Sequence, residues 1–249
     1  MGDALGDRMK QYEGMETERA SMPRLPIVVR IDGKGFSNWT AGLGLPFDER
    51  LQQLRVEVTR KLVEEFGATI GYCQSDEISL VLLSPREKSR PYCGGKFQKI
   101  VSHTASAATA FWNSMVPLYL PEKIGVPAMF DSRAWCVPDL EEAANALLWR
   151  ERDATKNSVC AAARALYKHD DILGQSLAKM QDMLFRKGVN WNDYPDWAKR
   201  GTYLGWKTSS DSISGAERRA VRVLNLPPAG KIENLPEVLF SGAEPLLKQ

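Results

Sequence analysis

Residues 25–36 read LPIVVRIDGKGF, and residues 68–83 read ATIGYCQSDEISLVLL. The first stretch predicts a buried strand, because apolar and β-branched residues run to Ile31 before a turn that contains two glycines. The second stretch predicts a hairpin of two strands with the acids Asp76 and Glu77 at its tip. The other predicted elements are placed relative to these three strands.

Helices and one further strand complete the pattern. Apolar residues recur at helical spacing in residues 48–66, where Asp48 is a suitable N-cap and Gly67 a stop signal. Residues 96–115 and 141–165 predict two more helices, and residues 127–137 predict a strand. The order β-α-β-β-α-β over residues 25–137 predicts an α+β, ferredoxin-like fold in which helices cover one face of an antiparallel sheet.

The composition is that of an ordinary globular chain, with 249 residues, 43% of them hydrophobic, and a formal net charge of +2. This charge neither indicates nor excludes a nucleic-acid partner. The four cysteines form no C-x-x-C pair, and with two histidines we expect no structural zinc site. No apolar run resembles a signal peptide or reaches the roughly 20 residues of a membrane span. We expect a cytoplasmic protein with free thiols and no membrane partner.

Two acids fall at adjacent strand ends. Asp32 closes the first strand and Asp76 lies at the hairpin tip, and these two points are neighbours in a split β-α-β-β sheet. Two carboxylates there repel each other unless a cation lies between them, and Mg²⁺ is the expected cation because it prefers oxygen ligands and bridges to phosphates. The Gly33 carbonyl is a candidate third ligand. The alternative is a turn aspartate beside a solvated hairpin tip.

The same residues carry a family resemblance. The segments Arg30–Phe36 and Gln74–Glu77 resemble the tRNA(His) guanylyltransferase superfamily, and in particular the Thg1-like proteins of bacteria and archaea. Further similar segments follow in the same order over about residues 2 to 207. They are Gly6–Lys10 with Tyr12–Glu13, Phe130–Arg133 with Val137–Pro138, Trp149–Asp153, Asn190–Asn192 and Arg200–Thr202.

The resemblance implies a palm domain like that of polymerases and nucleotide cyclases. It implies a nucleotidyltransferase that activates the 5′ end of a tRNA with ATP or GTP. The 3′-hydroxyl of an incoming nucleoside triphosphate (NTP) then attacks that end, so that the chain grows in the 3′-to-5′ direction. It also implies two Mg²⁺ ions, a homotetramer built as a dimer of dimers, and tRNA as the partner.

The resemblance also assigns residues. Asp32, Gly33 and Asp76 are implied as metal ligands, and Asp32, Asp76 and Glu77 as the catalytic set, with Glu77 supporting the site. The implied nucleotide-binding residues are Lys34, Gly35, Phe36, Asp48 and Ser75. The candidate RNA-binding residues are Arg150, Arg152, Lys156, Asn157 and Arg200, for which a solvated helix face is the alternative.

One departure bears on specificity. The eukaryotic enzymes carry an HINNLYNT motif where this chain has Thr155–Ala162 (TKNSVCAA), which keeps only Asn157 in place. This favours template-dependent repair of 5′-truncated tRNAs over dedicated addition of G at position −1 of tRNA(His). A nucleotide-cyclase-like palm enzyme and a non-catalytic RNA-binding module are the remaining alternatives.

The predicted organisation has three segments. Residues 1–140 are expected to form the palm-type catalytic domain, and residues 141–207 a helical, tRNA-contacting extension of it. Residues 208–249, which contain several prolines and little periodicity, are expected to form an extended C-terminal tail.

Overall fold

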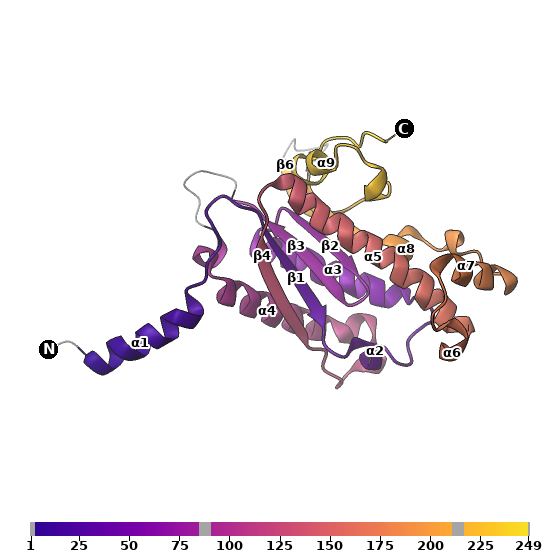
Figure 1. Ribbon diagram of the computed structural model, residues 1–249, viewed down its shortest axis with the longest axis horizontal. Coiled ribbons are helices and arrows are strands. Elements are labelled where there is room, and N and C mark those ends of the chain that lie inside the picture. The colour runs from indigo at the N-terminus through magenta and orange to yellow at the C-terminus, as the bar shows by residue number, and fades with distance from the viewer. Residues whose placement is uncertain (1–2, 85–90, 211–216, 249) are drawn as a thin grey trace.

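A six-stranded antiparallel sheet lies at the centre of the molecule (Figure 1). The computed structural model describes residues 3–84, 91–210 and 217–248. Within them the strand order is β4-β1-β3-β2-β5-β6. The strands are β1 Ile27–Gly33, β2 Ile70–Gln74, β3 Glu77–Leu82, β4 Phe130–Cys136, β5 Thr202–Ser210 and β6 Glu217–Leu224. The first four strands, with their two crossover helices, confirm the predicted β-α-β-β-α-β order.

Helices flank the sheet. Asp48 caps the helix that follows β1 by accepting hydrogen bonds from the amides of Arg50 and Leu51, and Gly67 ends that helix in the left-handed conformation, as predicted. The helices that the structure describes are α1 Ala4–Thr17, α2 Phe36–Trp39, α3 Glu49–Phe66, α4 Phe97–Tyr119, α5 Leu140–Leu166, α6 His169–Ile172, α7 Leu177–Arg186, α8 Asp196–Arg200 and α9 Leu235–Ser241. None of them is long and apolar enough to cross a membrane.

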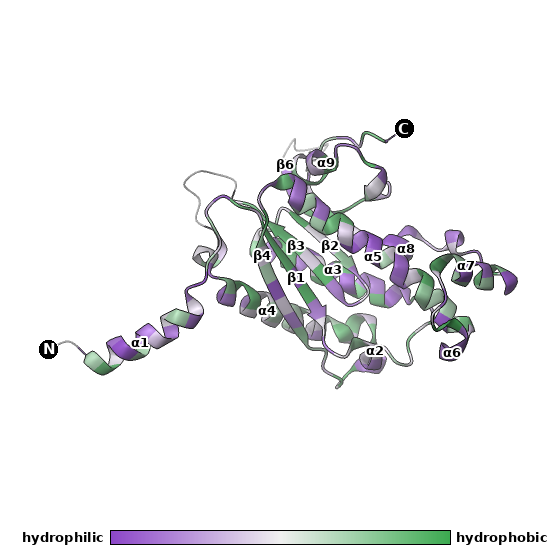
Figure 2. Cartoon of the chain, in the orientation of Figure 1, coloured by the Kyte–Doolittle hydropathy of each residue, from purple (hydrophilic) through white to green (hydrophobic). Residues whose placement is uncertain are grey.

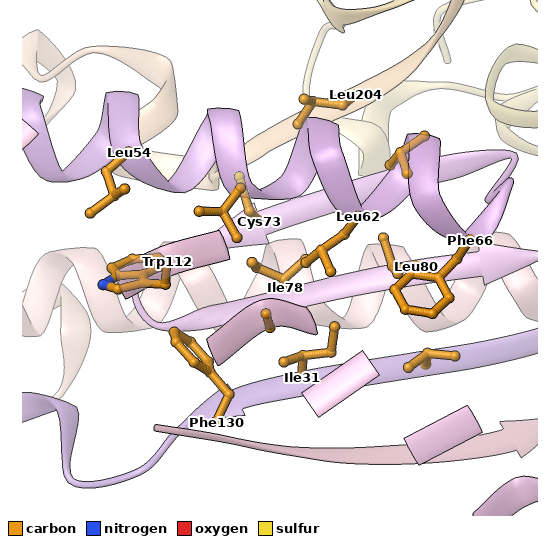
Figure 3. Close-up of a cluster of buried hydrophobic side chains, with 14 of the residues drawn as sticks. Ile31, Leu54, Leu62, Phe66, Cys73, Ile78, Leu80, Trp112, Phe130 and Leu204 are labelled. Carbon is orange, nitrogen blue, oxygen red and sulfur yellow. The ribbon is translucent and has the colours of Figure 1, made fainter. Parts of the chain in front are cut away.

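Both faces of the sheet are covered, whereas the prediction placed helices on one face. Helices α3 and α4 pack on Ile31, Ile78 and Leu80 of the first face (Figure 3). Helices α5 and α9 pack on the second face, where Val28 and Val81 are buried. Every residue of β2 and β3 is accordingly buried, and much of the central sheet is green in Figure 2. Uninterrupted apolar runs of this kind are typical of strands that are buried on both faces.

The C-terminal segment differs from the expected extended tail. Residues 217–248 contain β6, which pairs along β5, and α9, which buries Leu235, Val238 and Leu239 against α5. The sheet therefore takes strands from all three predicted segments. The elements here are short and separated by prolines, so they leave little periodicity in the sequence. Residues 211–216 and 249 lie outside the described residues.

Helix α1 is the exception to this packing. It projects from the body of the molecule, and none of its residues is buried (Figure 1). Leu5, Met9, Tyr12 and Met15 are all exposed large hydrophobic residues of this helix.

The packing of α9 predicts a stability effect. We expect Leu239→Ala to lower the free energy of unfolding by about 2–5 kcal/mol, because it deletes a buried side chain that is 4% exposed. Leu247→Ala is the control, since that side chain is 58% exposed, and it should change stability by less than about 0.5 kcal/mol. Urea denaturation measures both. An unchanged midpoint for Leu239→Ala would contradict the packing of α9.

Candidate active site

The structure brings Asp32, Gly33 and Asp76 together at one edge of the sheet. Asp32 and Gly33 end β1, and Asp76 lies in the two-residue turn between β2 and β3. The Gly33 amide donates a hydrogen bond to the Asp76 carbonyl oxygen at 3.1 Å. A Cβ atom on Gly33 would lie 3.0 Å from the Cβ of Asp76 and 2.4 Å from the Phe36 ring. Glycine is therefore required at this position for the two segments to approach so closely.

The electrostatics of this edge suit a cation. Burial raises the pKa of the Asp76 carboxyl, and the charge of Asp32 raises it further. A cation beside both carboxylates would relieve that repulsion. The described residues hold no group of three or more histidine, cysteine, aspartate or glutamate side chains that could form a complete metal site. This donor set fits Mg²⁺, which binds through one or two carboxylates and takes its other ligands from water and substrate phosphates.

Glu77 has a different role from its neighbour. Its two carboxylate oxygens accept hydrogen bonds from Nε and Nη2 of Arg150, both at 2.6 Å, and Arg150 also donates to Asp153 at 2.9 Å. Glu77 and Arg150 are both buried. Because this ion pair joins β3 to α5, Glu77 supports the site from inside the protein, and Arg150 is not the exposed RNA contact that we expected.

Two predicted nucleotide-binding residues also serve the fold. Phe36 is buried, with its ring 5.0 Å from Trp39 and 5.2 Å from Trp112, so its side chain belongs to the core. The Asp48 carboxylate accepts from Arg50 and from backbone amides, including that of Gly44. The side-chain hydrogen bond from Arg50, together with those amides, lowers the pKa of Asp48 to about 2. Asp48 therefore shapes the loop before α3 as an N-cap.

A cavity of about 200 Å³ lies next to the acids. The loop before α3, the β2–β3 turn, α5 and α8 form its walls. It brings together three of the predicted residues, Asp48, Ser75 and Asn157. Ser75 has a left-handed backbone (φ 46°) and an exposed side chain at the turn.

The remaining predicted residues lie outside this cavity. Lys34 is exposed immediately after the site acids, and Gly35 follows with φ 63° as the N-cap of α2. Arg152 and Lys156 are exposed on α5. Arg200 pairs with Asp196 at 2.6 Å, and its side chain is 16% exposed, so less of it is free for RNA than expected.

Sequence reasoning missed two features of the site. Arg55 lines the cavity, is buried, and has no hydrogen-bond partner for its Nε. It falls among the apolar residues of α3, where a buried cation could have been noticed as an exception to the pattern. On the sheet, Asp131 lies opposite Asp32, and Arg133 opposite Arg30. These cross-strand neighbours can be identified from the sequence only after the pairing of β1 with β4 is known.

The Glu77–Arg150 pair predicts a large loss of stability. We expect Arg150→Ala to lower the free energy of unfolding by about 3–5 kcal/mol, because Glu77 would keep a buried charge with only Arg30, 3.8 Å away, beside it. Arg152→Ala, on the exposed side of the same helix, should cost less than about 0.5 kcal/mol. Chemical denaturation compares the two variants. Equal losses would show that the buried pair has no special role.

Comparison with known proteins identifies the family. A model of the tRNA(His) guanylyltransferase (Thg1) family matches residues 6–138. Two structures of a bacterial tRNA(His) guanylyltransferase (Thg1)-like protein, in complex with ATP and with GTP, are each 34% identical to this chain. Their TM-scores are 0.85 and 0.78. The matches cover 96% and 92% of this chain, and 100% and 95% of the two matched chains. The tRNA(His) guanylyltransferase of Neurospora crassa is 28% identical over an alignment of 227 positions that covers 82% of this chain and 73% of that protein. The chain is therefore a nucleotidyltransferase that belongs to the tRNA(His) guanylyltransferase family.

Proposed function

We propose that this protein is a template-dependent 3′-to-5′ nucleotidyltransferase that adds nucleotides to the 5′ end of truncated tRNAs. The observation that carries the proposal is the juxtaposition of Asp32 and Asp76 beside a cavity that contains a buried arginine, Arg55. Carboxylates that hold a cation and a positively charged cavity wall are the two features that a polyphosphate substrate requires.

The acids have the first role in this proposal. Asp32, Asp76 and the Gly33 carbonyl would hold two Mg²⁺ ions, which would stabilise the charge on the reacting phosphate oxygens. Glu77 and Arg150 fix the β3 end of the hairpin against α5, so the turn that carries Asp76 keeps its place. Preorganised charge of this kind is usually the largest contribution to phosphoryl transfer.

The cavity has the second role. Arg55, Ser75 and Asn157 line it, and we assign to them the binding of the activating ATP or GTP. Arg55 is the strongest of these assignments, because its buried, partly unpaired guanidinium could donate a charge-assisted hydrogen bond to a phosphate. The ATP and GTP complexes of the bacterial relative support a nucleotide as the ligand. Lys34 is exposed at the same sheet edge and would contact phosphates of the incoming NTP.

Addition of a single G at position −1 of tRNA(His) is the second candidate function. The name of the family favours it. The sequence Thr155–Ala162 favours repair, because the exposed Asn157 is its one match to the motif of the eukaryotic enzymes.

Nucleotide addition to the 5′ end tests the proposal directly. With Mg²⁺ and single labelled NTPs, a tRNA that lacks its first nucleotide should be extended by the NTP that pairs with the template base. Asp76→Asn should reduce the rate by at least about 100-fold, because it removes a carboxylate that faces the reacting phosphates, and EDTA should abolish addition. Asp182→Asn, an exposed position on α7, is the control and should keep wild-type activity.

The outcomes separate the candidates. If the protein adds only G, and only to tRNA(His), its function is guanylyltransfer and not repair. If Asp76→Asn kept wild-type activity, the acids would have no part in the chemistry. Absence of any addition by folded protein would contradict both functions.

We also propose a homotetramer, supported by α1, whose exposed Leu5, Met9 and Tyr12 lack any cover within the described chain. A second copy of the chain would cover them. Light scattering after gel filtration should give the mass of four chains for the wild type. Met9→Glu should give a smaller species, while the neighbouring Lys10→Glu should not. A wild-type mass of one chain would contradict the proposal.

A further inference from the structure

Strands β5 and β6 extend beyond their neighbour in the sheet. Strand β2 pairs with β5 only from Thr202 to Gly205. Past that point β5 and β6 continue as a two-stranded ribbon, in which Trp206 lies opposite Val221 and Ser210 opposite Glu217. We call residues 206–210 and 217–222 the ribbon, counting Arg222, which lies opposite Gly205 at the last pair with β2. The base of the ribbon packs on the core, where Val221 is buried and Trp206 lies against the same cluster, whereas the pairs from Lys207–Ala220 to Ser210–Glu217 reach beyond the neighbouring strand.

The ribbon concentrates positive charge. It carries Lys207, Arg218, Arg219 and Arg222 against the single acid Glu217, in a chain whose formal net charge is only +2. All four basic residues are exposed. Lys207, Arg219 and Arg222 form no ion pair with any residue in the described ranges. The charges of these three residues are therefore not paired within the described part of the protein.

One of these arginines is held in place. The Arg219 guanidinium lies over the Trp206 ring, 4.6 Å from its centroid. The Trp206 indole N–H donates to the Ala68 carbonyl at 2.8 Å, which fixes the ring against the body of the protein. A planar guanidinium that is stacked in this way keeps its N–H groups free at the edge, where they fit the oxygens of a phosphate.

Protection of the sheet edge is the competing explanation. Strand β6 is an edge strand, and charged side chains on such a strand prevent pairing with other chains. That role is served by charges of either sign and needs no stacked arginine. The excess of positive charge and the Trp206–Arg219 contact thus favour an anionic partner.

The position of the ribbon relative to the site identifies the partner. Thr202, at the start of β5, pairs with Cys73 next to the turn that carries Asp76. At about 3.3 Å per residue, the basic residues lie roughly 10–25 Å from that point along the sheet. An RNA duplex whose 5′ end lies at the acids would present backbone phosphates over such distances. We infer that the ribbon binds the phosphate backbone of RNA, and, resting on the proposed function, that this RNA is the body of the tRNA substrate.

Salt-dependent binding tests this inference. In the variant Lys207→Gln/Arg219→Gln/Arg222→Gln, the Kd for truncated tRNA at 0.1 M salt should rise on the order of tenfold or more. The slope of log Kd against log salt concentration should fall by about 2.7, because each of the three lost phosphate contacts removes about 0.9 from it. The kcat at saturating tRNA and the KM for NTP should not change, because the ribbon does not touch the reacting groups.

Matched variants separate a local site from general charge. Arg8→Gln/Lys10→Gln/Lys61→Gln removes the same charge from exposed positions on α1 and α3 and should leave Kd within about twofold. Glu217→Gln should act in the opposite direction and lower Kd. Arg219→Glu/Arg222→Glu keeps the edge strand charged, so it should preserve solubility and elution volume while weakening RNA binding more than the glutamine variant.

The results distinguish this inference from the proposed function. If the wild type extends tRNA while the triple glutamine variant binds with unchanged Kd and salt slope, the ribbon is not an RNA site. An equal loss in the α1 and α3 variant, or a change of oligomeric state in the ribbon variant, also overturns it. If the wild type extends no tRNA but the ribbon variants still lose RNA affinity, the proposed function fails and the RNA site remains.

Discussion

The buried ion pair between Glu77 and Arg150 is the constraint on which the rest of the structure depends. It ties the first residue of β3 to the middle of α5, and so it connects the hairpin turn to the helix that covers the second face of the sheet. The next turns of α5 supply Ala154, Asn157 and Ser158 to the cavity wall. Because one contact sets both the turn that carries Asp76 and the wall opposite it, the acids and the cavity keep a fixed relation.

The site places like charges together, which a purely structural strand end would avoid. Asp32 and Asp76 share one sheet edge, while Arg30 and Arg133, which face each other on β1 and β4, each lie 3.9 Å from Asp32. Arg55 is buried beside the cavity with an unpaired Nε. The buried Asp76 and the buried Arg55 each cost free energy in the isolated chain, and on the proposed function a cation beside the acids and a phosphate beside Arg55 would relieve that cost. This combination is what distinguishes the site from a solvated turn.

The sequence predicts those parts of the fold that depend on local signals. The strand that ends at Asp32, the Asp48 cap and the stop at Gly67 follow from residue types alone, and they are confirmed. It does not predict features that depend on which strands pair. Phe36 resembles a site residue because it follows Asp32–Gly35, yet its ring is in the core, and Arg150 resembles a surface cation until Glu77 is placed beside it. The folded C-terminal segment was missed for the same reason, since β6 and α9 are stabilised by distant partners.

Although the net charge is near zero, acidic and basic residues are separated along the sheet. On the proposed function the acids at the end of β1 and in the β2–β3 turn hold a cation, whereas the ribbon carries Lys207, Arg219 and Arg222, which have no ion-pair partner among the described residues. Strand β5 connects the two regions, because it begins beside the turn at Cys73 and ends in the ribbon. A polyanion that reaches both regions would be attracted by the ribbon and repelled by the acids unless they hold their cation. Metal binding would then control where the end of that polyanion can settle, while the ribbon would hold its body.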